Sequence, residues 1–331
     1  MKITYFHRHP QNGFSIQRVF QTLTKEIEKD VDVENIYMPS KGSMPWDIIR
    51  NGIYAYRHRN RAGINHITGD VYYLCIFLPR KNLVVTMHDI GFYTSLSKGL
   101  KRVYKYIFWI LTLKFAEKIV FVSETSKKVV LNHIKLRENR LNVIENPISC
   151  EFKKSIKEFN LQKPIVLHLG MDPVKNLKNL IPALEGISCN LRLIGELREE
   201  YRQLLQMYNV EYSCISNLTD TQIITEYQNC DIVNFISIHE GFGMPIIEAQ
   251  ATGRVVITGN ISPMKEVAGG AAYLVDPYDV SEIHKAYITL INNSALRQEL
   301  IVKGFKNVEK YKASNITLKY LNLYNEILIT I

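Results

Sequence analysis

The sequence predicts an α/β protein built from two doubly wound parallel sheets. Short runs rich in β-branched residues alternate with segments whose apolar residues recur at helical spacing, which is the pattern of parallel strands joined by helices. The polar and charged stretch 147–163 interrupts this alternation once, and the pattern then restarts. Two series with a linker between them indicate two domains, and 331 residues with 46% hydrophobic content suffice for two cores.

The first series contains one amphipathic helix and several short strands. The helix opens at Gly13 and repeats apolar residues at helical spacing from Ile16 to Ile27. The strand Leu83–Met87 has continuous apolar character, as expected when both faces of a strand are buried. The other strands predicted in this series are Lys2–Phe6, Ile119–Val122 and Asn142–Ile144.

The second series repeats the alternation after the linker. We expect domains at residues 1–150 and 151–313, with a ligand outside the carboxyl ends of the strands, in a cleft between the domains. Residues 314–331 form a final helical segment, for which packing back on the first domain is one arrangement. The elements predicted after the linker are strands Ile165–Leu169, Leu191–Ile194, Asp231–Phe235 and Val255–Thr258 and helices Leu177–Leu184 and Leu318–Ile331.

Basic residues are concentrated in the first domain. Residues 1–150 hold 23 Lys and Arg against 12 Asp and Glu, a balance of +11, whereas residues 151–331 hold 18 against 20, a balance of −2. A basic domain joined to a near-neutral one suggests that the first domain meets something anionic. The candidates are a membrane surface, a lipid-linked phosphate or a nucleic acid, although no nucleic-acid-binding motif accompanies the charge.

Cysteine usage and hydropathy predict a cytoplasmic protein. The five cysteines are scattered and form no C-x-x-C pair, which favours reduced structural thiols over a disulfide framework or a zinc site. The N-terminus lacks the apolar stretch of a signal peptide, and the longest apolar run, Tyr106–Leu113, is too short to span a membrane. A peripheral position at the inner membrane face is compatible with this prediction.

Residues 100–115 predict a helix that is apolar on most of its circumference. One stripe includes Val103 and Ile107, a second includes Trp109 and Leu113, and four basic residues cluster at the start. Such a helix is buried or lies against lipid. We prefer a core helix with a solvated basic end; the alternative is a surface helix that docks on anionic lipid.

The segment that follows strand Asp231–Phe235 has the composition of a ligand-binding turn and helix. Gly241 and Gly243 flank Phe242, so the backbone can approach a ligand closely. Pro245 suits the first turn of a helix and Gly253 the position just past its end, which predicts a helix at Met244–Thr252. The N-terminus of such a helix favours an anion such as a diphosphate.

Glu240 and Glu248 are the candidate polar ligands of this segment. Ionised carboxylates accept hydrogen bonds from paired hydroxyls, so the two residues can hold different hydroxyls of one elongated ligand. Their spacing resembles the Glu-x7-Glu motif of retaining GT-B glycosyltransferases of family four, which include bacterial mannosyl- and glucosyltransferases. The block EGFGMPIIEAQATGRVVITGNISPMKEVAGGAAYLVDP is similar to the C-terminal block of that family, and the resemblance covers nearly the whole chain. The other similar positions are Gly13–Val19, His88-Asp89, Val122-Ser123-Glu124 and Gly170–Leu177.

This resemblance implies a GT-B fold, two Rossmann-like domains facing a central cleft, and a nucleotide-sugar donor. It implies that Glu248 binds the ribose, that Glu240 contacts the donor sugar, and that Lys175 neutralises the leaving diphosphate. His88 would face the reacting carbon from the first domain. The remaining donor-binding positions implied are Gly13, Asp89, Gly241, Phe242, Gly243 and Met244.

The same resemblance implies transfer with retention of anomeric configuration and without a metal or other cofactor. The acceptor would be a polysaccharide or lipid-linked glycan, and the donor a GDP- or UDP-linked hexose. The family often has an arginine beside the phosphate lysine, but here Val174 precedes Lys175, so Lys178 is a candidate second cation. Ser123 and Glu124 are as well explained by a helix N-cap as by a ligand.

Three other classes of protein fit the sequence less well. A nicotinamide dehydrogenase requires G-x-G-x-x-G after the first strand, which residues 6–16 lack. A nucleotide-sugar epimerase of the same fold is the enzymatic alternative. A basic nucleic-acid- or membrane-binding protein is the non-enzymatic alternative.

Asp30-Val31-Asp32 is a D-x-D sequence at the expected end of the first helix, and we interpret it as surface charge.

Overall fold

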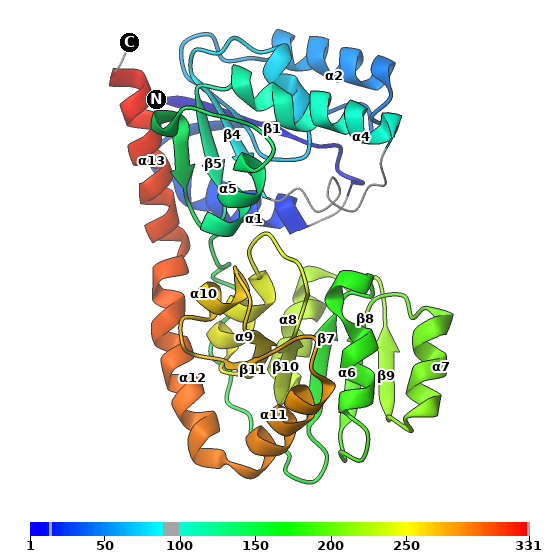
Figure 1. Ribbon diagram of the computed structural model, residues 1–331. Helices are drawn as coiled ribbons and strands as arrows, with labels where there is room; N and C mark the ends of the chain where they lie inside the picture. The colour runs from blue at the N-terminus through cyan, green and yellow to red at the C-terminus, as the bar shows by residue number, and fades with distance from the viewer. Residues whose placement is uncertain (13–14, 89–98, 330–331) are drawn as a thin grey trace. The chain divides into compact units, whose positions relative to one another are not determined.

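The chain forms two compact units, each organised around its own sheet. The computed structural model describes residues 1–12, 15–88 and 99–329 (Figure 1). Unit 1 comprises Met1–Ser149 together with Lys312–Ile331, and unit 2 comprises Cys150–Tyr311. The final helix therefore groups with the N-terminal part of the chain, although it follows unit 2 in sequence.

Unit 1 contains a parallel sheet of six strands in the order β2-β1-β3-β4-β5-β6. All pairs are parallel, and the register places Val85 of β4 opposite Ile119 of β5. The strand order reverses between β1 and β3, which makes the carboxyl ends of these two strands the switch point of the sheet. The strands are β1 (Lys2–His7), β2 (Asp32–Tyr37), β3 (Ile64–Ile67), β4 (Leu83–Met87), β5 (Lys118–Phe121) and β6 (Leu141–Val143).

Helical elements cover both faces of this sheet. Helix α2, together with η1, η2 and η3, packs on one face, and α1 and α13 pack on the other (Figure 1). The helical elements are α1 (Ser15–Ile27), α2 (Pro45–Arg57), η1 (Tyr72–Ile76), α4 (Leu100–Lys105), η2 (Tyr106–Ile110), η3 (Leu111–Phe115), α5 (Glu124–Leu131), η4 (Glu138–Arg140) and α13 (Ala313–Ile329).

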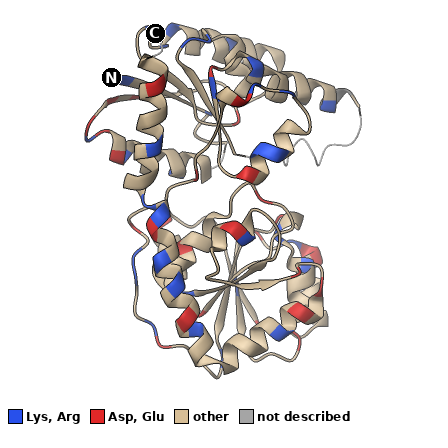
Figure 2. Cartoon of the chain, turned by 60° about the vertical axis from the view of Figure 1, so that its left-hand side comes forward, with Lys and Arg blue, Asp and Glu red and all other residues tan. Residues whose placement is uncertain are grey.

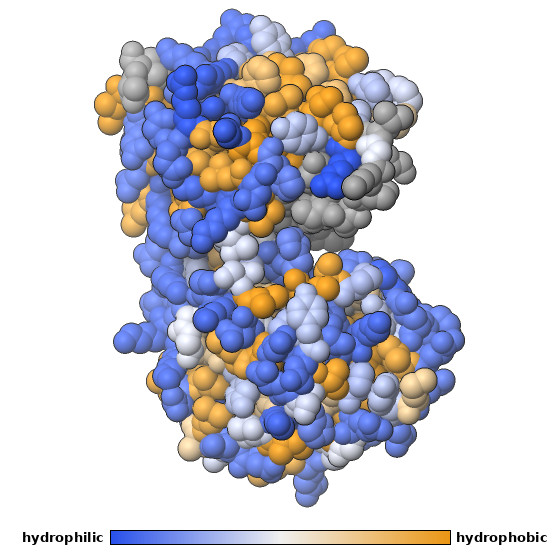
Figure 3. Space-filling model, viewed as in Figure 1, coloured by the Kyte–Doolittle hydropathy of each residue, from blue (hydrophilic) through white to orange (hydrophobic). Residues whose placement is uncertain are grey.

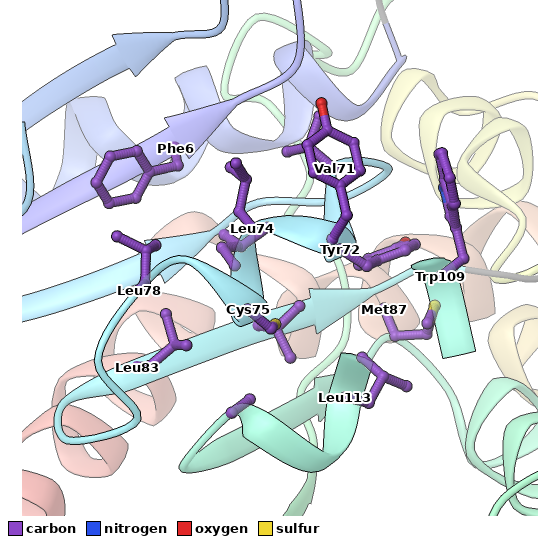
Figure 4. Packing of buried hydrophobic residues seen from close by; sticks show 14 of the residues in the cluster. Phe6, Val71, Tyr72, Leu74, Cys75, Leu78, Leu83, Met87, Trp109 and Leu113 are labelled. Atoms are coloured by element: carbon purple, nitrogen blue, oxygen red, sulfur yellow. The ribbon is translucent and has the colours of Figure 1, made fainter. Parts of the chain in front are cut away.

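The first core lies between the sheet and η1, η2 and η3. Alternate residues of β4, Leu83 and Met87 among them, face the side chains of η1 and η3 (Figure 4). Trp109 and Leu113 close the same cluster from the segment that follows α4. This packing explains why β4 is apolar along its length: residues on both of its faces are buried.

Helix α13 is fixed to the opposite face by buried polar side chains. His66 on β3 lies between the hydroxyl oxygen of Tyr324, 2.6 Å from Nδ1, and that of Thr86, 2.8 Å from Nε2. The Tyr320 hydroxyl lies 3.2 Å from the Thr86 hydroxyl. Burial lowers the pKa of His66 well below its usual value, and the neighbouring His7 and His88 lower it further.

The segment 100–115 differs from the single helix that its sequence predicts. It is helical throughout but divides into α4, a π-helical turn η2 and a 3₁₀ turn η3. Trp109 and Leu113 are buried, whereas Val103 and Ile107 are 55% and 40% exposed. The preferred interpretation as a core helix is therefore correct for one stripe only, because the two stripes lie on different sides of the segment and only one of them faces the core.

Two smaller predictions at the start of the chain are also corrected. Helix α1 ends at Ile27, so Asp30-Val31-Asp32 does not end that helix, and Asp32 is the first residue of β2. The surface interpretation of these charges is correct, because Asp30 and Asp32 are exposed. Asp32 forms an ion pair with Lys2 on the adjacent strand, with 3.8 Å between Nζ and Oδ2.

Unit 2 repeats the parallel architecture with the order β12-β11-β10-β7-β8-β9. Helices α6, α7 and α11 pack on one face, and α8, α9 and α10 lie on the other (Figure 1). The elements are β7 (Ile165–Leu169), η5 (Pro173–Lys175), α6 (Leu177–Ala183), β8 (Asn190–Ile194), α7 (Glu199–Met207), β9 (Tyr212–Ile215), α8 (Asp220–Asn229), β10 (Ile232–Phe235), α9 (Met244–Thr252), β11 (Val255–Gly259), α10 (Met264–Ala268), β12 (Tyr273–Val275), α11 (Val280–Asn292), α12 (Ser294–Val308) and η6 (Glu309–Tyr311).

The predicted linker 147–163 contains no helix or strand, as its composition indicates. It is nevertheless attached to unit 2. The Asp231 carboxylate, which is almost fully buried, accepts hydrogen bonds from the backbone N–H groups of Asn160 (3.1 Å) and Ile165 (2.8 Å) and pairs with Lys157. Across the described residues, no helix is both long and apolar enough to cross a membrane.

Candidate active site

The candidate site lies at the switch point of the second sheet. Strand β7 pairs with β8 on one side and with β10 on the other, so the strand order reverses between β7 and β10. Ligands of open parallel sheets bind outside the carboxyl ends of the strands at such a point. The turn after β7 carries Lys175 and the turn after β10 carries Glu240.

The turn after β7 is held in a defined shape by backbone geometry. Gly170 has a φ of +90°, and a Cβ at this position would lie 3.2 Å from the Lys175 side chain. Asn176 adopts the left-handed conformation with a φ of +67°, and its side-chain amide donates to the carbonyl oxygens of Ile236 (3.2 Å) and Pro277 (2.6 Å). Lys175 therefore lies in a turn that hydrogen bonds hold to the segments after β10 and β12.

Lys175 and Glu240 form an ion pair across the two turns. The Lys175 ammonium lies 2.6 Å from the Glu240 carboxylate, and the side chains are only 23% and 17% exposed. The ammonium also lies 5.1 Å from the centre of the Phe235 ring. Two residues that are 65 positions apart in sequence are thus brought into contact, next to the start of α9.

Helix α9 spans Met244–Thr252, as its sequence predicts, with Pro245 in the first turn. Its N-cap is Gly243, whose φ of +116° is a conformation that side chains with a Cβ rarely adopt. Gly253 ends the helix in the left-handed conformation. Phe242 is almost fully buried and packs edge-on against Tyr311 at 5.6 Å, so it fixes the turn that contains Gly241 and Gly243.

The side chain of Glu248 on α9 is almost fully buried. It is 4% exposed, and its Oε2 accepts a hydrogen bond of 2.6 Å from the Tyr227 hydroxyl. Tyr227 belongs to α8 and has no sequence signal that marks it as a site residue.

A buried histidine lies close to the Lys175 turn. The Nδ1 atom of this histidine accepts a hydrogen bond of 2.9 Å from the side-chain amide of Asn234. The Tyr287 hydroxyl donates to Asn234 Oδ1 at 2.7 Å and thereby orients the amide. Burial, together with a smaller effect of the positive charge of Lys175, lowers the pKa of this residue, His168, to about 3. His168 is therefore neutral at physiological pH and adds no charge to the site.

In unit 1 the predicted residue His88 follows β4 at the carboxyl edge of its sheet. Its Nε2 lies 2.9 Å from the carbonyl oxygen of Thr68, the residue after β3. The ring packs on Gly69, whose φ is +148°, and a Cβ there would lie 2.8 Å from the ring. The orientation of His88 is thus set by a glycine and a carbonyl that its local sequence does not reveal.

An ion pair that sequence reasoning missed lies at the switch point of the same sheet. Arg8, directly after β1, pairs with Asp70, which follows β3. The Arg8 side chain is 13% exposed, and Asp70 adopts a positive φ of +56°. Ligands are expected at the carboxyl ends of strands where the strand order reverses, which is the position of Arg8. The sequence does not predict β3 as a strand, so it does not show where the strand order reverses.

Of the remaining predicted positions, two lie outside the described residues and two lie at the starts of helices α5 and α6. Gly13 and Asp89 lie outside the described residues. Ser123 is the N-cap of α5: its side chain accepts a hydrogen bond of 3.0 Å from the Ser126 N–H, which agrees with the capping interpretation. Lys178, the candidate second cation, is exposed on α6. Within the described part of the chain, no group of three or more His, Cys, Asp or Glu side chains is arranged to hold a metal ion.

The fold is shared with GT-B glycosyltransferases of known structure. The crystal structure of HepE from Anabaena in complex with UDP and glucose superposes with a TM-score of 0.80, covering 98% of this chain and 100% of that one. The sequence identity in this comparison is 16%, so it establishes the fold alone.

Family models identify the chain more closely. The model described as "Glycosyltransferase Family 4" matches residues 17–152, and that described as "Glycosyl transferases group 1" matches residues 150–307. The chain therefore belongs to the GT-B glycosyltransferases of the family-four type.

Curated relatives from Escherichia coli are similar to parts of the chain. The serotype-specific mannosyltransferase WbdA is 25% identical over 224 residues, which are 60% of this chain but only 28% of that protein. The O-antigen chain mannosyltransferase B is 24% identical over 275 residues, which are 75% of this chain and 72% of that protein. This chain thus corresponds to less than a third of WbdA but to most of the second relative.

Proposed function

We propose that the protein transfers a hexose from a nucleoside-diphosphate sugar to a polysaccharide or lipid-linked glycan. The observation that carries the proposal is the Lys175–Glu240 pair at the switch point of unit 2, beside the N-terminus of α9. A cation and a helix N-terminus suit a diphosphate, and a carboxylate next to them suits the hydroxyls of the attached sugar.

Four of the predicted residues have a stated role in this proposal. Glu248 accepts hydrogen bonds from the ribose, and the Tyr227 hydroxyl holds its carboxylate in place. Lys175 exchanges its contact with Glu240 for the diphosphate, which frees Glu240 to bind the sugar. Positive charge on Lys175 then stabilises the negative charge that grows on the leaving diphosphate. His88 is proposed as a further contact of the sugar.

The finer features of the reaction belong to the same proposal. Transfer proceeds with retention of the anomeric configuration and without a metal, because Lys175 and the helix N-terminus supply the positive potential. A mannosyl donor is supported by the two mannosyltransferase relatives. UDP, which is bound together with glucose in the structural neighbour, is the alternative nucleotide to test. The reaction takes place in the cytoplasm or at the inner membrane face, and nucleic acid plays no part in it.

A thermal-shift titration with GDP, UDP, ADP and dTDP tests the donor assignment. A ligand that binds only the folded protein stabilises it by about 2.7 kcal/mol at one hundred times its dissociation constant, so one diphosphate should raise the melting temperature by several degrees. Addition of EDTA should leave this shift and the sugar transfer unchanged. The proposal fails if none of the four nucleotides shifts the transition.

Replacing Glu248 with glutamine should weaken binding of the preferred diphosphate about tenfold. A hydrogen bond to a charged acceptor contributes about 1.5–3 kcal/mol, and a neutral one about 0.5–1.5 kcal/mol. Glutamine is preferable to alanine because alanine would remove the acceptor of the Tyr227 hydroxyl and leave a cavity. Calorimetric titration measures the affinity, with the exposed Glu299→Gln on α12 as the matched control. Equal affinity of both variants would mean that the ribose site lies elsewhere.

A further inference from the structure

Helix α2 in unit 1 exposes an apolar stripe that its own packing does not use. Trp46, Ile49, Ile53 and Tyr56 are 65%, 53%, 47% and 47% exposed. At about 100° per residue these four side chains lie within roughly 80° of one another around the helix. Contiguous exposed apolar residues of this size mark a docking surface more often than scattered ones do.

The inner side of α2 is fixed by a separate set of contacts. Asn51 is fully buried; its side-chain amide donates to the Tyr73 hydroxyl at 2.8 Å and to the Ser40 carbonyl at 3.1 Å, and its Oδ1 accepts from the Ser40 N–H. Gly52 allows the Phe77 ring to approach, since a Cβ there would lie 2.4 Å from the ring. The helix is thus held without any contribution from its outer stripe.

Positive charge lies beside the stripe. Arg50 and Arg57 are on the outer side of α2, and Arg59 stacks on the Tyr56 ring, with 3.6 Å from its guanidinium carbon to the ring centre. Residues 38–69 contain five Lys and Arg and one acidic residue, Asp47. A second basic cluster, with Lys101, Arg102 and Lys105, lies at the start of the segment after residue 99, and in the rest of unit 1 basic and acidic residues are mixed (Figure 2). The charge at α2 is therefore one of two local excesses of positive charge in unit 1.

These arginines are available to a partner. No ion pair among the described residues involves Arg50, Arg57 or Arg61. Asp47, the single carboxylate on α2, accepts a hydrogen bond from the Met44 N–H at the start of the helix and lies away from the exposed stripe. The outer side of α2 therefore combines apolar side chains with unpaired positive charge.

The apolar surface continues onto the segment after residue 99. The Tyr104 hydroxyl donates to the carbonyl of Ser43, just before α2, so the two segments are neighbours. Val103 and Ile107 are exposed on this segment. In Figure 3 hydrophobic residues gather over α2 and over the stretch from α4 to η3. The stripe of α2 is the larger apolar part of this surface.

We infer that the outer side of α2 docks on an anionic lipid bilayer. Trp46, Ile49, Ile53 and Tyr56 enter the boundary between headgroups and acyl chains, and Arg50 and Arg57 meet the lipid phosphates. A helix of 13 residues, about 20 Å long, lies in the plane of the surface rather than across it. This inference deepens the proposed function: it assigns the surface that holds the enzyme near a lipid-linked acceptor.

An anionic bilayer fits these observations better than a second copy of the chain. An isologous interface would place Arg50 and Arg57 of one copy near the same residues of the other, where like charges repel. Tryptophan and tyrosine among aliphatic residues, with arginines beside them, is the composition of a helix at a membrane interface.

Co-sedimentation of the full chain with lipid vesicles tests the inference. At low salt we expect the protein to bind vesicles of phosphatidylglycerol and phosphatidylcholine but not vesicles of phosphatidylcholine alone. Trp46→Ser/Ile53→Ser should lower the partition coefficient at least tenfold. Arg50→Gln/Arg57→Gln should lower it by about fivefold per charge, an effect that disappears at high salt.

The matched control replaces apolar residues that are equally exposed on unit 2. Met207→Ser/Val302→Ser removes side chains that are 72% and 65% exposed and should leave vesicle binding unchanged. Equal loss in the control and the α2 variants, or binding that is indifferent to the α2 substitutions, would overturn the inference. So would a sedimentation-velocity result in which the wild type is a dimer and the α2 variants are monomers.

A functional readout separates this inference from the proposed function. The α2 variants should keep the nucleotide-induced thermal shift and transfer to a detergent-solubilised acceptor, while transfer to the same acceptor in vesicles falls. If no nucleotide binds the wild type but vesicle binding depends on α2, the docking surface stands and the proposed donor site fails. If transfer in vesicles equals that of the wild type, the docking role is wrong.

Discussion

Replacing Lys175 with alanine is expected to lower the turnover number about 10²–10³-fold, with a much smaller rise in the dissociation constant of the nucleoside diphosphate. The reason is that charge builds up on the diphosphate only as the bond to the sugar breaks. A fixed ammonium in a partly buried turn stabilises that charge more than it stabilises the bound donor. Initial-rate kinetics and calorimetric titration of the same variant provide the two numbers.

The ion pair with Glu240 gives Lys175 a second explanation, and a double-mutant cycle distinguishes the two. If Lys175 serves only to position Glu240, then Lys175→Ala, Glu240→Gln and the double variant should lose turnover equally. If Lys175 acts on the diphosphate and Glu240 on the sugar, the double variant should lose more than either single variant. Lys285→Ala, at an exposed position on α11, is the matched control and should retain most of the activity.

Acidification from neutral pH to about pH 5 is expected to destabilise the fold by several kcal/mol. Burial lowers the pKa of His7 to about 4, that of His168 to about 3, and that of His66 well below 6.5. Between these values and the unfolded pKa of 6.5, the unfolded chain binds protons that the native protein does not. The free energy of unfolding therefore falls as the pH drops below 6.5, by about 2 kcal/mol at pH 5 for each of His7 and His168, and His66 acts in the same direction.

Urea denaturation at a series of pH values measures this slope, and single substitutions assign it. His168→Gln retains a side-chain oxygen that can accept from Asn234, and it should remove about 2 kcal/mol of the loss between pH 6.5 and 5. A pH-independent free energy of unfolding in this window would contradict the assignment of neutral buried histidines.

The strongest sequence signals correspond to segments whose environment is uniform along their length. Strands β4 and β7 have the predicted bounds because almost every residue in them is buried, so composition alone marks them. Helix α9 also has the predicted bounds, because Pro245 and Gly253 carry conformational preferences that act locally. The glycosyltransferase resemblance rests on the same segment, and the matches to known families confirm it.

Other elements were missed where neighbours rather than composition decide the conformation. Strand β3 is only four residues long and includes Asn65 and His66, which are polar but fully or almost fully buried. His66 is tolerated there because Tyr324 and Thr86 provide hydrogen-bond partners from α13 and β4. The sequence does not predict helix α2, because its apolar residues lie on both its packed and its exposed sides. An amphipathic helix is recognised by apolar residues that recur on one side only.

By itself, the sequence determined that the chain has two α/β domains and a Glu-x7-Glu segment of glycosyltransferase type. Periodicity and glycine or proline preferences act over a few residues, so they can be read locally. Only the tertiary structure decided that Lys175 meets Glu240, that Tyr227 holds Glu248, and that α2 rather than the segment after residue 99 carries the larger exposed apolar stripe. Those contacts join residues that are distant in sequence, and the packing of whole sheets and helices brings them together.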